Sequence, residues 1–134
     1  MGEFHWPVRV YYEDTDSGGV VYHSQYLNFM ERARTEWLRA LGFEQDLLRN
    51  EHKLLFAVHS MQITYRRPAR FNDALLIKSQ LLKASGASMQ FEQKLYRGEE
   101  LLCEASVRIA SLDAESFRPK SIPKSILTEM HSVC

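Results

Sequence analysis

The densest group of polar side chains that could do chemistry follows the first apolar segment of the chain. It reads Tyr12-Glu13-Asp14-Thr15-Asp16-Ser17-Gly18-Gly19-Val20-Val21-Tyr22-His23, and a long helix-like segment follows it. The start of a helix offers free backbone N–H groups and the positive end of a dipole. Those donors can polarise a carbonyl while a nearby carboxylate acts as base on water or attacks the carbonyl itself. The pattern favours an acyl-transfer site; the other interpretation is an acidic turn that caps the helix.

Several other kinds of site do not fit the sequence. Asp14, Asp16 and Gly19 match positions one, three and six of a calcium loop, but position twelve is Gln25 where a bidentate Glu is required. The sequence contains no Gly-x-Ser-x-Gly elbow and no Walker or dinucleotide glycine pattern. The histidines show no paired ligand spacing. We therefore expect neither a metal nor a prosthetic group.

Apolar spacing predicts the first elements that position this cluster. Residues 7–12 are apolar or aromatic apart from Arg9, which predicts a first strand. Apolar side chains at three- and four-residue steps then predict a helix of about four turns or more, ending near Gly42. They are Tyr26, Leu27, Phe29, Met30, Ala33, Trp37, Leu38 and Leu41. Residues 47–48 suggest a further short turn.

The second half of the chain has the pattern of strands joined by short turns. The predicted strands span residues 54–66, 74–82, 88–96 and 101–112. In the third of them, one face carries Met89, Phe91, Gln93 and Leu95. Residues 122–131 predict a terminal helix. The sequence thus predicts a single α+β domain over residues 1–134, with one helix on an antiparallel sheet. Because one helix leaves the other sheet face and the edges uncovered, we expect a homo-oligomer.

Composition excludes several classes of protein. The 134 residues carry 17 Lys plus Arg and 17 Asp plus Glu, a balance that argues against a nucleic-acid binder. No apolar run is long enough to cross a bilayer, and the N-terminal residues lack the features of a secretory signal. We therefore expect a cytoplasmic protein without an integral membrane segment. Cys103 and Cys134 are expected to be free thiols.

The polar cluster and its surroundings resemble the signature of a known enzyme family. The matching residues are Arg9-Val10-Tyr11-Tyr12-Glu13-Asp14-Thr15-Asp16, Gly19-Val20-Val21-Tyr22-His23, Tyr26-Leu27, Glu31-Arg32-Ala33-Arg34 and Tyr96-Arg97-Gly98-Glu99-Glu100-Leu101-Leu102-Cys103. They are similar to hotdog-fold acyl-CoA thioesterases of the 4-hydroxybenzoyl-CoA thioesterase-like family, and within it to the Tol-Pal-associated type. The resemblance implies a long helix wrapped by an antiparallel sheet that continues across a dimer, often in a dimer of dimers.

The resemblance also implies roles for individual residues. It places the catalytic carboxylate on Asp16, as nucleophile or general base, and the carbonyl-polarising N–H on His23. Tyr12 and the His23 side chain are implied as supporting groups. Asp14 is the rival carboxylate, for which a structural hydrogen bond is expected. Glu31, two helical turns beyond His23, is expected to form a salt bridge.

Coenzyme A carries phosphates, so a basic patch near the site is required. Arg66, Arg67 and Arg70 flank Pro68 at the end of a predicted strand. The resemblance makes Lys83 and Ser88, at the next turn, plausible nucleotide contacts. The other interpretation of these side chains is ordinary solvated loop charge. The glycine pair ending at Gly19 lets backbone approach a ligand closely.

These observations predict an acyl-CoA thioesterase that releases a carboxylic acid and coenzyme A. One alternative is a module associated with Tol-Pal or lipid synthesis that binds acyl carrier protein with little turnover. A hotdog dehydratase pairs a catalytic His with a helix carboxylate of the partner chain. It is a weaker alternative, because His23 lies beside Asp16 in the thioesterase motif.

Overall fold

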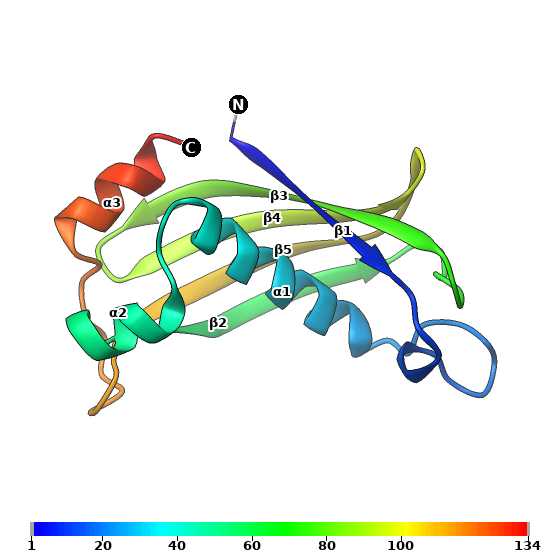
Figure 1. The fold of residues 1–134 in the computed structure, drawn as a ribbon, viewed down its shortest axis with the longest axis horizontal. Helices are drawn as coiled ribbons and strands as arrows, with labels where there is room; N and C mark the ends of the chain where they lie inside the picture. The colour runs from blue at the N-terminus through cyan, green and yellow to red at the C-terminus, as the bar shows by residue number, and fades with distance from the viewer. Residues whose placement is uncertain (1, 134) are drawn as a thin grey trace.

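A computed structural model describes residues 2–133, so Cys134 lies outside the described residues. Five antiparallel strands form one sheet in the order β1-β3-β4-β5-β2 (Figure 1). The strands are β1 (Glu3–Arg9), β2 (Leu54–Tyr65), β3 (Ala74–Ser85), β4 (Ser88–Arg97) and β5 (Glu100–Asp113). The helices are the 3₁₀ turn η1 (Tyr12–Asp14), α1 (Gln25–Ala40), α2 (Gln45–His52) and α3 (Lys124–His131). The prediction of an α+β fold with one long helix on an antiparallel sheet is confirmed.

Helix α1 lies across the inner face of the sheet because its apolar side chains share one stripe. Its buried members are Tyr26, Phe29, Met30, Ala33, Trp37 and Leu38. The inner sheet face meets this stripe with alternate residues of each strand, as in β4, where Met89, Phe91, Gln93 and Leu95 are buried. These are the residues that the alternating sequence pattern placed on one face.

The outer face of the sheet is polar, which differs from the expectation that this face needs a covering partner. Gln90 and Glu92 lie there on β4, and Ser106 and Arg108 lie beside them on β5. Polar side chains of this kind are stable in water without cover. The edges of the sheet, rather than its outer face, therefore favour an oligomer.

The first strand begins and ends earlier than the sequence interpretation placed it. It spans Glu3–Arg9, and Phe4, Trp6 and Val8 pack against the core. The period-two pattern was present in the sequence, but Pro7 in its middle obscured it. Pro7 is tolerated because β1 is an edge strand that pairs only with β3.

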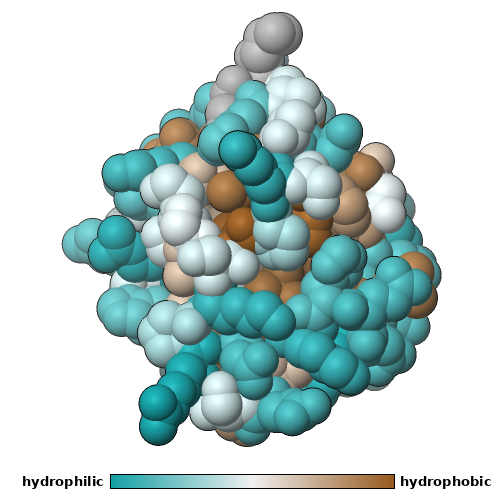
Figure 2. Space-filling model, turned by 90° about the vertical axis from the view of Figure 1, so that its left-hand side faces the viewer, coloured by the Kyte–Doolittle hydropathy of each residue, from teal (hydrophilic) through white to brown (hydrophobic). Residues whose placement is uncertain are grey.

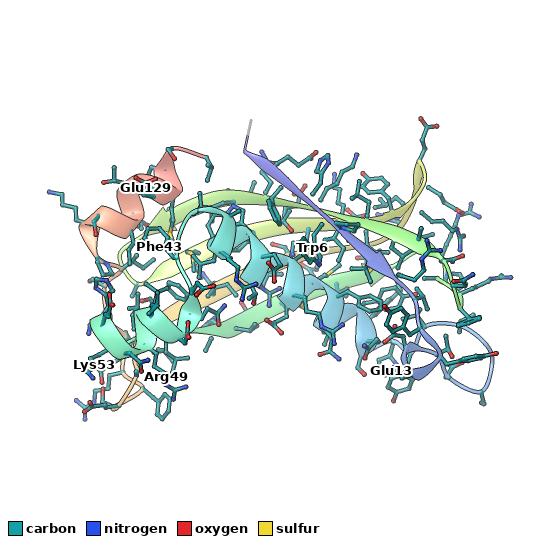
Figure 3. All side chains as sticks on the ribbon, viewed as in Figure 1. Trp6, Glu13, Phe43, Arg49, Lys53 and Glu129 are labelled. Carbon is teal, nitrogen blue, oxygen red and sulfur yellow. The ribbon has the colours of Figure 1, made fainter. Side chains whose placement is uncertain are left out.

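The two ends of the molecule carry different elements. Glu13 lies at one end, whereas Arg49, Lys53 and Glu129 lie at the other, where α2 and α3 pack (Figure 3). Viewed from that second end, apolar side chains form the floor of a hollow with a polar rim (Figure 2). No helix within residues 2–133 is long and apolar enough to cross a membrane.

Candidate active site

The loop between β1 and α1 is folded into a compact turn by backbone hydrogen bonds. Asp16 N–H donates to the Val20 carbonyl at 2.9 Å, and Gly19 N–H donates to the Asp16 carbonyl at 3.1 Å. Gly19 has φ +80°, a backbone conformation that favours glycine, and a side chain there would meet only open space. Gly19 is therefore required for the shape of the turn, and it leaves the space above it free.

The two aspartates of this loop have different environments. Asp14 is only 5% exposed, and its carboxylate accepts hydrogen bonds from Tyr11 N–H and Gln25 Nε2, both at 2.8 Å. Asp16 is exposed, and its Oδ1 accepts one hydrogen bond, from Gly18 N–H at 2.8 Å. Asp14 thus makes structural hydrogen bonds in the loop, as expected, whereas the second carboxylate oxygen of Asp16 has no hydrogen-bond partner among residues 2–133.

The start of α1 presents unused backbone donors beside this loop. Ser24 is the N-cap residue, and its side chain makes no capping hydrogen bond. Within the described residues, the N–H groups of His23 and Ser24 donate to no protein acceptor. They are therefore free to bind a carbonyl oxygen, and the helix dipole adds to their effect.

Tyr65 at the end of β2 holds the helix start in place, and sequence reasoning did not identify it. Its hydroxyl donates to the His23 carbonyl at 2.8 Å, and its ring packs edge-on against Tyr26. The Tyr26 hydroxyl in turn accepts a hydrogen bond from Ala69 N–H at 3.0 Å. Burial raises the pKa of both tyrosines, so both remain protonated at neutral pH. No local sequence signal could have revealed contacts between residues this far apart in the chain.

A pocket of about 270 Å³ opens at this point. Its lining residues are Val21, His23, Tyr26, Tyr65, Arg66, Arg67 and Pro68. The structure thus brings Arg66 and Arg67 to the same pocket as His23, although they are distant in sequence. Tyr12, for which the resemblance implied a supporting role, does not line this pocket: it is 77% exposed, and its ring stacks on Phe71 with centroids 4.1 Å apart.

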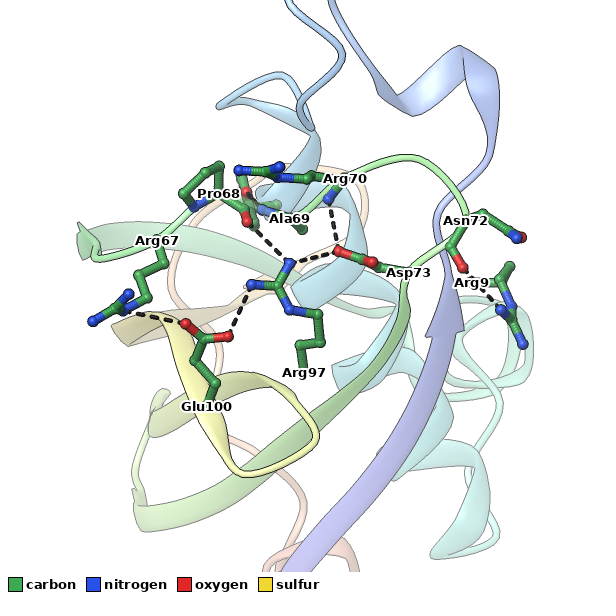
Figure 4. A network of polar contacts seen from close by, with 10 residues as sticks. Arg9, Arg67, Pro68, Ala69, Arg70, Asn72, Asp73, Arg97 and Glu100 are labelled. Atoms are coloured by element: carbon green, nitrogen blue, oxygen red, sulfur yellow. Dashed lines mark hydrogen bonds and ion pairs between the residues drawn. The ribbon is translucent and has the colours of Figure 1, made fainter.

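The basic side chains near the pocket differ in whether an acidic group already neutralises them. Arg66 is paired with Glu104, and Arg67 with Glu100 at 3.2 Å. Arg97 joins the same network through Asp73 at 2.7 Å and Glu100 at 2.8 Å (Figure 4).

The exception in this basic group is Arg70. Among the residues that the structure describes, no carboxylate forms an ion pair with its guanidinium, although its N–H donates to Asp73 at 2.8 Å. Burial opposes ionisation of Asp73, but hydrogen bonds from Arg97 and from Arg70 N–H lower its pKa overall. The backbone of Arg70 pairs with Val20 of the site loop. Arg70 is thus the unneutralised cation of this group.

Three other predicted residues lie away from this pocket. Lys83 and Ser88 flank the turn between β3 and β4, at the opposite end of the sheet near α3 (Figure 1). The length of β3 separates that turn from Arg70, at the site end of the sheet, by roughly 35 Å. Lys83 and Ser88 of the same chain therefore do not reach His23. Glu31 makes no salt bridge within residues 2–133 and instead accepts a hydrogen bond from the Thr35 hydroxyl at 2.7 Å. The salt bridge expected at Glu31 was therefore wrong.

Cys103 is buried, and it is free. Burial raises its pKa to about 12, so the thiol stays protonated and unreactive. In the part of the chain described here, no three His, Cys, Asp or Glu side chains are grouped so as to hold a metal ion.

The fold and the site loop together match one protein family. The thioesterase-like superfamily model matches residues 10–130, and the chain belongs to that family. It is similar to a group within it: 44% identical over 128 residues to the acyl-CoA thioesterase YbgC of Haemophilus influenzae, with 96% of this chain and 94% of that one covered. The acyl-CoA thioester hydrolase YbgC of Escherichia coli O6:H1 is 46% identical over 127 residues, covering 94% of both chains.

Solved structures agree with this assignment. The crystal structure of a probable thioesterase from Bartonella henselae superposes with a TM-score of 0.87 at 40% identity, covering 90% of this chain and 99% of that one. The resemblance inferred from the sequence motif, and the hotdog fold that it implied, are confirmed.

Proposed function

We propose that the protein hydrolyses acyl-CoA thioesters. The observation that carries this proposal is the exposed Asp16 carboxylate on a loop that ends at the free N–H groups of His23 and Ser24. The relatives named acyl-CoA thioesterases support the choice of substrate. Release of free thiol from a series of acyl-CoAs tests the proposal, and absence of release from every acyl-CoA would overturn it.

In the proposed reaction, the thioester carbonyl oxygen accepts hydrogen bonds from His23 N–H and Ser24 N–H. Negative charge that develops on this oxygen is stabilised by those donors and by the helix dipole. Asp16 either takes a proton from the attacking water or attacks the carbon itself, giving an anhydride that water then cleaves. In both routes the C–S bond breaks, the sulfur leaves as the coenzyme A thiolate, and the acid is released. No metal ion is needed for either route.

We further propose that Arg70 binds a phosphate of coenzyme A. Its guanidinium has no acidic partner among the described residues, whereas Arg66 and Arg67 already have one each. Arg70→Gln is expected to raise KM about three- to tenfold with little change in kcat, since an exposed charge contact contributes modestly. Steady-state kinetics at two salt concentrations check this result, because added salt screens the contact.

Two comparisons sharpen this prediction. Arg66→Gln should raise KM less than Arg70→Gln, because Glu104 holds the Arg66 guanidinium. With an acyl-pantetheine substrate, which has no nucleotide, Arg70→Gln should match the wild type. An equal loss with both substrates would mean that Arg70 acts on the site loop rather than on phosphate.

The edges of the sheet support a homodimer. The β1 edge carries Pro7 and the charged residues Glu3 and Arg9, which discourage pairing with another chain. The β2 edge, Leu54–Tyr65, contains no proline, lysine, arginine or acidic residue. A long edge without such protection is a template for strand pairing. We therefore propose that two copies pair through β2, alone or within a dimer of dimers.

Light scattering is expected to give at least twice the 15.6 kDa mass of one chain. Ser60→Lys, at an exposed position of β2, should lower that mass on dilution, because it places like charges near each other in the paired strands. His5→Lys on the β1 edge is the matched control and should leave the mass unchanged. A single-chain mass for the wild type at micromolar concentration would contradict the proposal.

A further inference from the structure

A second cavity, of about 240 Å³, lies further along α1 between this helix and β2. Its lining residues are Glu31, Arg34, Thr35, Trp37, Leu38, Gln45, Phe56, Val58, Met89, Phe91 and Ile109. Most of these side chains are apolar, and Trp37 packs edge-on against Phe91 with ring centroids 5.0 Å apart. This cavity and the His23 pocket both lie between α1 and β2: Tyr26 and Tyr65 line the pocket, and Trp37 and Phe56 line the cavity.

Arg34 is the one positively charged side chain of this cavity lining, and its charge is poorly compensated. Its amino group Nη1 donates to Gln93 Oε1 at 2.8 Å. Over residues 2–133 it forms no salt bridge, because the neighbouring Glu31 lies beyond contact distance and accepts from Thr35 instead. Arg34 thus has one neutral hydrogen-bond acceptor for a guanidinium that carries five N–H donors.

An arginine in this position is costly unless its remaining donors find acceptors. Arg34 is half-buried, and burial lowers its pKa, an effect that Glu31 only partly opposes. A charged group that is partly removed from water and lacks a counter-charge destabilises the folded chain. The amide of Gln93 is itself buried and fully used, so it cannot move to compensate. An acceptor from outside the chain would remove this cost.

We propose that Arg34 is a specificity-determining residue whose guanidinium binds an oxygen on the acyl group of the substrate, remote from the thioester. This inference rests on the proposed thioesterase function, and it adds a class of substrate: acyl groups that carry a hydroxyl or a carboxylate along or at the end of the chain. The apolar side chains of the cavity contact the carbon chain, and Arg34 selects the polar group.

The dimensions of the helix agree with this assignment. Ser24 and Arg34 are separated by ten residues of helix, about 15 Å along its axis. Side chains on a helix lean toward its N-terminus, so the guanidinium is closer to the carbonyl site than that. The cavity is smaller than the pockets of about 300–1,000 Å³ that hold drug-sized ligands, which suits a modest acyl group.

The experiment compares three acyl-CoA series of matched chain length, from butanoyl to decanoyl: saturated, terminally hydroxylated and terminally carboxylated. For the wild type, kcat/KM at the best length is expected to be about tenfold or more higher for an oxygen-bearing chain than for the saturated one. Comparing the hydroxylated with the carboxylated series shows which of the two groups Arg34 selects. The two can differ, because the negative charge of Glu31 in the cavity lining repels a carboxylate but not a hydroxyl. Arg34→Met should reduce this ratio to about one.

Arg32→Met is the matched control, because it removes the same charge from an exposed position two residues away and should keep the wild-type ratio. Calorimetric binding of the same compounds to Asp16→Asn protein, with and without Arg34→Met, measures the preference without turnover. Hydrolysis with a ratio near one in both assays overturns the role of Arg34 while the thioesterase function stands. Absence of hydrolysis by the wild type would overturn the thioesterase function. The role of Arg34 would then be decided by calorimetry alone, from the ratio of the affinities for oxygen-bearing and saturated acyl-CoAs with and without Arg34→Met. A preference ratio that Arg34→Met leaves unchanged would overturn the inference. If that variant also lost the dimer, Arg34 would be shown to contact the second chain instead of the substrate.

Discussion

Asp16→Asn is expected to lower kcat/KM for acyl-CoA hydrolysis by roughly 10²-fold or more, the usual scale for loss of an acid–base group. Asparagine has nearly the same shape and can still accept the hydrogen bond from Gly18 N–H through its oxygen. It can neither take a proton from water nor attack the thioester carbon. Thiol release from the best acyl-CoA, measured for both proteins side by side, gives the ratio directly. KM should change much less than kcat, because the loss falls in the transition state.

Two neighbouring carboxylates serve as controls for this result. Glu13 is exposed in the same loop, and Glu13→Gln should keep wild-type rates. Asp14→Asn should lower the melting temperature, because Asp14 accepts two hydrogen bonds that hold the loop. If Asp14→Asn abolished turnover in a folded protein while Asp16→Asn did not, the assignment of the two aspartates would be reversed.

The same comparison separates hydrolysis from the alternative of a binding module. If the protein acts by binding acyl carrier protein with little turnover, Asp16→Asn should leave that binding intact. Wild-type protein would then release little thiol from any acyl-CoA. Slow release that is equal in the wild type and in Asp16→Asn would favour the binding module.

The elements of the fold were predictable because their signals are local. The apolar stripe from Tyr26 to Leu38 marks α1, and the alternation from Met89 to Leu95 marks the inner face of β4. The start of β1 was missed because Pro7 interrupts a pattern that an edge strand tolerates.

The loop residues of the candidate site could be proposed because they are close in sequence, and Arg66 and Arg67, which line the His23 pocket, because coenzyme A requires positive charge near the site. Asp16 and His23 share one loop, and the motif proposed a role for each of them. Tyr65 reaches His23 from β2, a contact over a separation of 42 residues that only folding creates. Lys83 was placed near the site by resemblance alone, and one chain puts it at the other end of β3. A role for Lys83 in binding nucleotide therefore requires a second copy of the chain.

Gln93 was assigned to the inner face by its alternation with apolar neighbours, and the structure explains why an amide is there. Its side chain is 0% exposed and makes three hydrogen bonds. Nε2 donates to the Met30 carbonyl at 3.0 Å and to the Ser79 hydroxyl at 2.9 Å, and Oε1 accepts from Arg34. One buried amide thus joins the middle of α1 to β3 and β4.

Gln93→Ala is expected to lower the free energy of unfolding by about 2–4 kcal/mol, because it leaves a cavity and several unpaired buried groups. Urea unfolding at equal protein concentration measures the loss, since assembly also contributes to stability. Gln90→Ala is the control on the same strand. Gln90 lies on the outer face, and among residues 2–133 its side chain makes one hydrogen bond, from Nε2 to the Ser106 hydroxyl, which is long at 3.5 Å. Its loss should cost no more than about 0.5 kcal/mol.

A third variant separates the lost volume from the lost hydrogen bonds. Gln93→Leu refills most of the cavity but still leaves Arg34 and Ser79 without their partner. If unpaired polar groups dominate, Gln93→Leu should be nearly as unstable as Gln93→Ala. Adding Arg34→Met to Gln93→Leu should then recover part of the loss, because the guanidinium that Gln93 accepts from is gone. Full recovery by leucine alone would mean that Gln93 serves only to fill space, and that Arg34 finds its acceptors elsewhere.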